Sequence, residues 1–357
     1  MYKEEFYKRI LSILPYTEDE SKHFRKRLSS ILKVYQEWVR ELSVDGRPVD
    51  ENTLSAIKFI CNKLKDIVES SMKGLASTAY IQLRNLLQDN DYNPQMIDLK
   101  SVLTVINKGK SFFRMRQMDC IYKVKRKELF HIPFDKRGII KAQRYSTPGY
   151  PCLYLGESIY TCWEEMRRPP MYSCAVSRFV NLKEGTFLDL TIPCLEKITN
   201  ESYLKLLPLI ISCMIRVSND NHTYKPEYII PQLLIEWVLK QRQDKRQLGV
   251  EVHGVMYTST HRDDEFHFPI KMATNYAIPV FSVDINTLYC KKLTKYYHLT
   301  KPTTNEIEQL KGCYDSMWEM LESAPDMEEE EKIYYASSFG QLEQRLKDEN
   351  TFQIDSI

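Results

Sequence analysis

The sequence predicts an α+β protein in which a small all-α bundle precedes a mixed core of strands and helices. Residues 1 to about 90 carry apolar side chains at helical spacing. From about residue 100, short runs rich in Val, Ile, Tyr and Phe alternate with helical runs. The run from Gln88 to Pro94 is polar and turn-forming, as a linker between two parts of a chain would be.

The first part consists of amphipathic segments. The apolar spacing predicts helices at residues 2–14, 24–42, 50–68 and 75–87. Asp50 stands where a side chain can accept a hydrogen bond from the first turn of the third helix. Such helices bury their apolar faces only against one another, so we expect a helical domain over residues 1–95.

The second part combines strands and helices, and we expect it to extend over residues 100–295. Strand-like runs occur at residues 151–155, 173–180, 186–190, 252–258 and 278–283. Helical runs lie between them, at residues 158–166, 203–217 and 231–243. Residues 296–357 again look helical, and we expect them to form a C-terminal extension.

Composition narrows the class of protein. The net charge of +2 indicates no global field that would attract nucleic acid, so we do not expect a nucleic-acid partner. Apolar runs are far shorter than the roughly 20 residues that span a bilayer, and we expect no membrane partner. The nine cysteines are scattered and several lie in apolar runs. We interpret them as reduced thiols, which predicts a cytoplasmic protein.

One turn–strand–helix stretch carries side chains suited to chemistry. Residues 146–149 form a turn, which places Arg144 at its mouth rather than in a core. Tyr154 lies in the following strand, and Glu165 lies about two turns into the next helix, which Ser158 can cap. The three residues Arg144, Tyr154 and Glu165 are therefore expected to converge on one cleft.

These residue types fit a dinucleotide that is held for cleavage at its glycosidic bond. An arginine fork binds two phosphate oxygens at once. A tyrosine ring can stack on a heteroaromatic base. A carboxylate can hold ribose hydroxyls and stabilise positive charge on a sugar carbon. The sequence contains no Gly-x-Gly-x-x-Gly, so it gives no support for a Rossmann site and hydride transfer.

Several segments occur in the order and spacing of a known family. They are Phe113 to Arg116, Arg144-Tyr145, Pro148-Gly149, Leu153 to Ser158, Thr161, Glu165, Tyr228 to Leu234, and Gly254 to Ser259. On these segments, between about residues 110 and 280, the chain resembles the RES-domain family. The family's usual glycine–arginine–tryptophan is Gln143-Arg144-Tyr145 in this sequence. Typical members are single small domains, whereas this chain adds residues before and after that region.

The resemblance implies an ADP-ribosyltransferase-like core and membership among toxins of bacterial toxin–antitoxin pairs. It implies that NAD is the substrate, that Glu165 is the catalytic carboxylate, and that Tyr154 packs on nicotinamide. Arg144 would bind phosphate or ribose. Further substrate contacts would come from Arg114, Tyr145, Ser158 and Ser259. The partner implied is an antitoxin with a helix-turn-helix domain.

Some alternatives stay open at this point. Glu164 competes with Glu165, and Arg116 competes with Arg114. The same pocket could transfer ADP-ribose to a protein, or the chain could be a catalytically silent module that binds a nucleotide or a partner. A homo-oligomer is a further alternative. His253, His261 and His267, with the acidic residues 263–265, match no standard ligand spacing, so we expect no metal.

Overall fold

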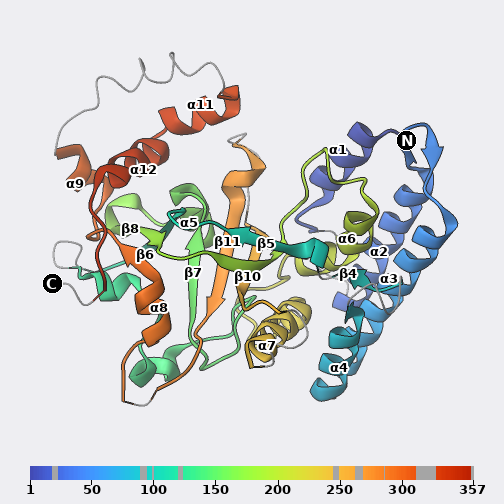
Figure 1. The fold of residues 1–357 in the computed structure, drawn as a ribbon, viewed down its shortest axis with the longest axis horizontal. Coiled ribbons are helices and arrows are strands. Elements are labelled where there is room, and N and C mark those ends of the chain that lie inside the picture. The colour runs from blue at the N-terminus through green and yellow to red at the C-terminus, as the bar shows by residue number, and fades with distance from the viewer. Residues whose placement is uncertain are drawn as a thin grey trace. The chain divides into compact units, whose positions relative to one another are not determined.

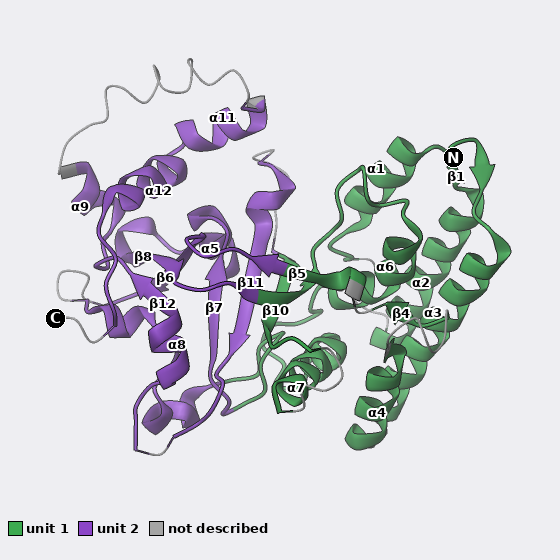
Figure 2. Ribbon diagram, viewed as in Figure 1, with its two compact units in different colours: residues 1–104, 141–148, 186–260 green, residues 105–140, 149–185, 261–357 purple. Residues whose placement is uncertain are grey.

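The computed structural model describes residues 1–17, 23–88, 95–98, 100–119, 124–243, 249–261, 268–284, 286–310 and 327–354. The chain is a mixed α+β protein with N-terminal helices, which confirms the predicted fold class (Figure 1). It divides into two compact units, each assembled from distant parts of the sequence (Figure 2). Unit 1 contains residues 1–104, 141–148 and 186–260, and unit 2 contains residues 105–140, 149–185 and 261–357.

Unit 1 is mainly helical. Its helices are α1 (Lys3–Ile13), α2 (Phe24–Glu41), α3 (Glu51–Met72), α4 (Ala76–Leu86), α6 (Glu201–Cys213) and α7 (Ile229–Gln243). Its strands are β1 (Ser43–Val44), β2 (Arg47–Pro48), β3 (Leu87–Gln88), β4 (Ile97–Asp98), β9 (Gly185–Leu190) and β10 (Val252–Thr258), with β5 (Leu103–Ile106) at the boundary. Strands β9 and β10 pair in parallel, with Tyr257 opposite Leu190.

The N-terminal helices pack directly on later helices of the same unit. Helices α2 and α3 both contact α6, and α3 and α4 both contact α7. The buried hydroxyl of Tyr35 in α2 donates to the carbonyl of Leu204 in α6 at 2.7 Å. Asp50 caps α3, as predicted, by accepting from the amide N–H of Thr53 at 3.0 Å. The apolar faces that the sequence predicts are therefore buried between early and late parts of the chain.

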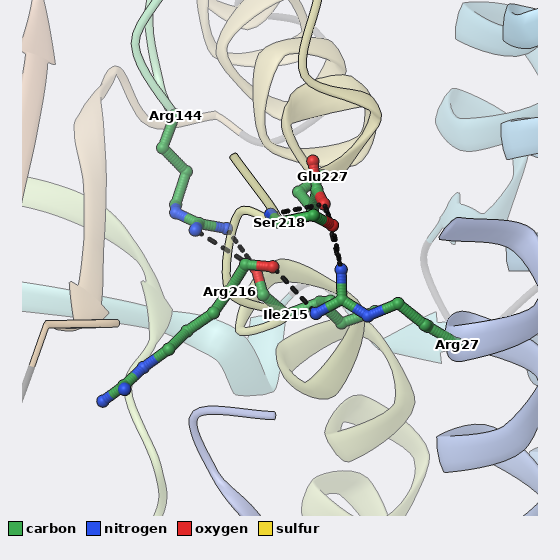
Figure 3. Close-up of polar contacts among 6 residues, drawn as sticks. All are labelled: Arg27, Arg144, Ile215, Arg216, Ser218 and Glu227. Carbon is green, nitrogen blue, oxygen red and sulfur yellow. Dashed lines mark hydrogen bonds and ion pairs between the residues drawn. The ribbon is translucent and has the colours of Figure 1, made fainter. Parts of the chain in front are cut away.

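A buried ion pair reinforces this packing. Arg27 of α2 and Glu227 are 1% and 2% exposed, and Nη1 of Arg27 lies 3.1 Å from Oε1 of Glu227 (Figure 3). The same guanidinium donates to Oγ of Ser218 at 2.6 Å and to the carbonyl of Arg216 at 3.0 Å. The segment after α6 is thereby fixed to the second helix of the chain.

Unit 2 is built on an antiparallel sheet with strand order β12–β8–β6–β7–β11. The strands are β6 (Ser111–Gln117), β7 (Cys152–Gly156), β8 (Cys174–Asn181), β11 (Thr274–Pro279) and β12 (Tyr297–Leu299). The helices are α5 (Ile159–Glu165), α8 (Lys291–Tyr296), α9 (Asn305–Leu310), α11 (Glu329–Ala336) and α12 (Ser338–Asp348). Helix α5 packs on β6 and β7, and α12 packs on α5 and β8.

Most predicted elements are confirmed within a few residues, and one strand is wrong. The last strand was expected at residues 278–283, whereas β11 covers 274–279. Pro279 is the last residue of this strand and pairs with Cys152. The linker residues 89–94 lie outside the described residues. The described helices include none with the length and apolar character needed to cross a bilayer.

The buried Arg27–Glu227 pair generates a prediction about stability. Arg27→Met leaves the Glu227 carboxylate buried without its cation, which typically costs about 3–5 kcal/mol. We expect urea unfolding to show a loss of that size, and the exposed neighbour Lys26→Met to show almost none. The double variant Arg27→Met/Glu227→Gln should recover most of the loss. If Arg27→Met lowers the free energy of unfolding by less than about 1 kcal/mol, the pair does not support the fold.

A second stability prediction concerns Glu343 in α12. Burial raises the pKa of Glu343 from 4.5 to about 7. Hydrogen bonds from Tyr334 and Ile159, and the charge of Lys347, act in the opposite direction but are weaker. The folded state therefore binds this proton more tightly than the unfolded state does. The free energy of unfolding should fall by about 3 kcal/mol from this group as the pH rises from 4.5 to 7. Glu343→Gln should remove that part of the pH dependence in denaturant titrations, and an unchanged profile would contradict the assignment.

Candidate active site

The predicted site residues fall into two sets, one in each unit. Arg114, Tyr154, Ser158 and Glu165 belong to unit 2, whereas Arg144, Tyr145 and Ser259 belong to unit 1. The members of each set lie on neighbouring elements of their own unit. The convergence of the two sets on one nicotinamide pocket stays a prediction.

In unit 2, the predicted strand and helix are present as β7 and α5. Tyr154 is the central residue of β7, and Glu165 is the last residue of α5. Gly156 joins the two elements, and a Cβ there would lie 2.7 Å from Sγ of Cys162 and 3.0 Å from the carbonyl oxygen of Ser158. Only glycine therefore allows the helix to return this closely over the end of the strand.

Glu165 is held by a neighbouring strand. Nδ2 of Asn275 in β11 donates to Oε1 of Glu165 at 2.6 Å. Asn275 is buried, at 5% exposure, and pairs with Gly156 in the sheet. Nε2 of His261 lies 3.9 Å from Oε2 of Glu165, and the Glu165 side chain is 30% exposed. The carboxylate is thus oriented by a fixed amide, lies near an imidazole and is partly exposed.

Glu164 has a different environment from Glu165. Its side chain is 5% exposed and forms an ion pair with Arg168, whose Nε lies 3.0 and 3.1 Å from the two carboxylate oxygens. Arg168 also lies over the ring of Trp163, 5.5 Å from its centroid. This carboxylate is committed to a local structural pair, whereas the Glu165 side chain is more exposed, at 30%.

Arg114 supplies a cation beside Tyr154. Nη1 of Arg114 in β6 donates to the carbonyl oxygen of Tyr154 at 2.5 Å. Its Nε has no hydrogen-bond partner among the described residues. Desolvation, followed by the nearby charge of Arg116, lowers the pKa of Arg114 to about 9, so it remains a cation at neutral pH. Arg116 instead donates to the carbonyl of Glu128 at 2.6 Å.

Ser158 is the N-cap of α5, as its position predicts. Its Oγ accepts from the amide N–H of Thr161 at 3.0 Å and donates to the carbonyl of Met272 at 2.8 Å. The residue is fully buried. Its observed role is to begin the helix, and the substrate contact implied by the resemblance stays a prediction.

In unit 1, Arg144 is buried, and its expected position at the mouth of a turn is wrong. The residue is 8% exposed. Nη1 donates to the carbonyl of Cys213 at 2.8 Å. Nη1 and Nη2 both donate to the carbonyl of Ile215 at 3.2 Å (Figure 3). The guanidinium also lies over the Tyr228 ring, 5.3 Å from its centroid. Turn residues predict where the chain reverses, but they do not show that a distant segment covers the side chain.

The other two predicted residues of unit 1 are also buried. Tyr145 is 1% exposed and packs on Tyr257 of β10, with ring centroids 4.4 Å apart. Ser259 follows directly after β10 and is 1% exposed. The contact with Tyr257 brings Tyr145 beside β10, and the shared pocket of Tyr145 and Ser259 that the resemblance implies stays a prediction.

Sequence reasoning missed Asn275 as a partner of Glu165. One signal was present, because asparagine is depleted in strands and a buried polar amide in an apolar strand needs a reason. The acidic residues 263–265 and His267 lie outside the described residues. Among the residues that the structure describes, no group of three or more His, Cys, Asp or Glu side chains could hold a metal ion.

Comparison with known proteins identifies relatives. Residues 121–282 match the family model of the RES domain. The chain is 30% identical over 333 residues to a protein of Bacillus subtilis (strain 168) that bears the name "Putative toxin YopC". That alignment covers 87% of this chain and 73% of the relative. No solved structure matches the chain.

The contacts of Arg144 predict a structural cost for its removal. Arg144→Ala leaves the carbonyls of Cys213 and Ile215 without a buried donor, which should lower the free energy of unfolding by about 2–4 kcal/mol. Lys141→Ala, at an exposed position in the same segment, is the matched control and should change it by less than about 0.5 kcal/mol. If Arg144→Ala is as stable as the parent in urea titrations, these hydrogen bonds do not support the fold.

Proposed function

The chain belongs to the RES-domain family, and on that premise we propose that it is a toxin that consumes NAD by breaking the bond between nicotinamide and ribose. The observation that carries the proposal is the environment of Glu165. This carboxylate is partly exposed and is oriented by the buried amide of Asn275. The name of the Bacillus subtilis relative supports the toxin assignment.

The main requirement of this reaction is stabilisation of the positive charge that develops on the ribose, because neutral nicotinamide can leave without protonation by an acid. The bond between the ribose anomeric carbon and the nicotinamide nitrogen breaks, and its electron pair leaves with neutral nicotinamide. Positive charge then develops on the ribose, as in other glycosidic cleavages. A carboxylate fixed beside that carbon lowers the barrier because it is already oriented when the charge appears.

Glu165 is suited to this role by its partners. The amide N–H group of Asn275 donates to Oε1 of Glu165 and thereby orients the carboxylate. The contact also fixes one oxygen of the carboxylate and so limits its rotation. Because Asn275 is itself the second residue of the buried strand β11 and pairs with Gly156, the donor does not have to reorganise during the reaction.

The remaining roles follow from charge and shape. We assign Tyr154 to packing on nicotinamide, and Arg114 to the binding of a phosphate or ribose oxygen. Arg144 would contribute to phosphate binding through the N–H groups that it does not use on the carbonyls of Cys213 and Ile215. Tyr145, Ser158 and Ser259 would then act mainly by holding these groups in place.

The acceptor of ADP-ribose decides the class of enzyme. With water as nucleophile, NAD and water give nicotinamide, ADP-ribose and a proton. Incubation with NAD labelled in the adenosine part separates the alternatives. Free labelled ADP-ribose supports hydrolysis, and label on a macromolecule supports transfer. Binding of intact NAD without turnover supports a catalytically silent module.

The activity of a toxin has to be inhibited in the cell that makes it. We propose that a small antitoxin with a helix-turn-helix domain binds this chain, and that both act in the cytoplasm. Co-purification of the chain with the product of a neighbouring reading frame, and loss of NAD consumption in that complex, would support this partner. The size of the purified chain in solution would decide whether it is a homo-oligomer.

The proposal predicts different outcomes at the two adjacent carboxylates. Glu165→Gln should reduce NAD consumption by about two to three powers of ten, because a focused electrostatic group contributes about 3–4 kcal/mol to the barrier. Glu164→Gln is the matched control and should keep activity within about threefold, although it weakens the pair with Arg168. Both variants should retain the circular dichroism of the parent. Full activity in Glu165→Gln would refute the assignment.

A further inference from the structure

Helix α5 has an unusual source of support at its first turn. The first N–H groups of a helix have no partner within the helix and need acceptors from elsewhere. Ser158 supplies one locally, for the amide of Thr161. The amide of Ile159 instead donates to Oε1 of Glu343 at 2.6 Å, from a residue 184 positions later in the chain.

Glu343 is itself fixed in place. It lies in α12 and is 2% exposed. The hydroxyl of Tyr334, which comes from α11 and is fully buried, donates to the same Oε1. Both residues follow the part of the chain that matches the RES domain. The carboxylate therefore connects the C-terminal helices directly to the first residue of α5.

Apolar packing around this contact places residues of the C-terminal segment against α5. Leu342 and Leu346 of α12 share a buried cluster with Ile159 and Cys162, on one side of α5. Tyr160, on another side of α5, packs in a second buried cluster with Met272 and Tyr334. The partly buried residues around this cluster are Trp163, Phe268, Tyr335 and Phe339. Two sides of this short helix thus contact the C-terminal segment.

The opposite end of α5 carries the proposed catalytic carboxylate. The helix has seven residues and ends at Glu165. A helix of this length does not persist without tertiary contacts. The position of Glu165 opposite Asn275 therefore depends on what holds Ile159 and the two faces of the helix. A displacement of about 1 Å at a reacting group can cost about two powers of ten in rate.

We propose that Glu343 is a positioning residue for Glu165. It accepts the hydrogen bond of the Ile159 amide and thereby sets the rotation and axial position of α5, so the C-terminal segment forms part of the active site. This inference rests on the proposed function of Glu165. The stabilisation of α5 by Glu343 can be measured separately by hydrogen–deuterium exchange, without NAD.

Substitutions in the full chain test the inference. Glu343→Met keeps the length of the side chain and removes the acceptor, and it should lower kcat for NAD consumption at least tenfold while KM for NAD stays within about twofold. Glu343→Gln keeps an oxygen for the Ile159 amide and should restore kcat to within about threefold of the parent. Asp348→Asn removes an exposed carboxylate from the same helix and should change neither constant.

Hydrogen–deuterium exchange separates this inference from the proposed function. Glu343→Met should speed exchange in a peptide that covers residues 159–165, and Glu343→Gln should not. Unchanged exchange in Glu343→Met overturns the inference, whether or not the parent chain consumes NAD. A parent chain without NAD turnover overturns the proposed function, and with it the link from Glu343 to catalysis.

A milder variant keeps the test decisive if Glu343→Met does not fold. Tyr334→Phe removes the hydroxyl that orients the Glu343 carboxylate, which weakens the contact with the Ile159 amide without removing the acceptor. We expect a threefold or greater fall in kcat with KM unchanged, and faster exchange of α5. Parental kcat and parental exchange in folded Tyr334→Phe would overturn the inference.

Discussion

The described structure of unit 2 depends on how a seven-residue helix is held. Helix α5 is too short to be stable alone, yet it ends in the carboxylate on which the proposed chemistry depends. Its first amide is held by Glu343, its N-cap is Ser158, and its last side chain contacts Asn275. Each of these contacts comes from a different element. The geometry of Glu165 is therefore a property of the packed unit and not of the helix.

Contacts between distant residues also connect the N-terminal helices to the rest of unit 1. The N-terminal helices place Arg27 in a buried pair with Glu227 and on the carbonyl of Arg216. Arg144 donates to the preceding carbonyls of the same segment, at Cys213 and Ile215. Two buried arginines, from separate parts of the sequence, thus hold one short stretch of backbone. A buried pair of this kind is a poor source of net stability but is costly to break, so it specifies which segments pack together.

The sequence predicted local structure well because local structure depends on neighbouring residues. Helical periodicity located α1 to α4, and short apolar runs located β7, β8, β9 and β10. Ser158 and Asp50 were recognised as caps from their positions alone. The strand at residues 274–279 was displaced in the prediction because its buried Thr, Asn and Tyr do not form an apolar run.

Contacts between distant residues were not predictable in this way. Arg144 is covered by carbonyls about 70 residues away, and Asn275 reaches Glu165 across 110 residues. No periodicity or spacing links such pairs. The resemblance to a family indicated Arg144, Tyr154 and Glu165 as a set, but it could not indicate Glu343, because that residue lies outside the family's domain. The domain boundaries at residues 95 and 295 stay predictions, since the compact units join segments from both sides of them.

The separation between Ile159 and Glu343 has a consequence for biosynthesis. A ribosome adds about 5–20 residues per second, so 184 residues correspond to roughly 10–40 s of translation. During that interval the nascent chain has made α5 but not the helix that holds it. The ion pair between Arg27 and Glu227 likewise cannot form until the ribosome has added the 200 residues that separate them. The contact that holds the first residue of α5 can therefore form only after α12 has been synthesised, so the order of synthesis delays the packing of this helix.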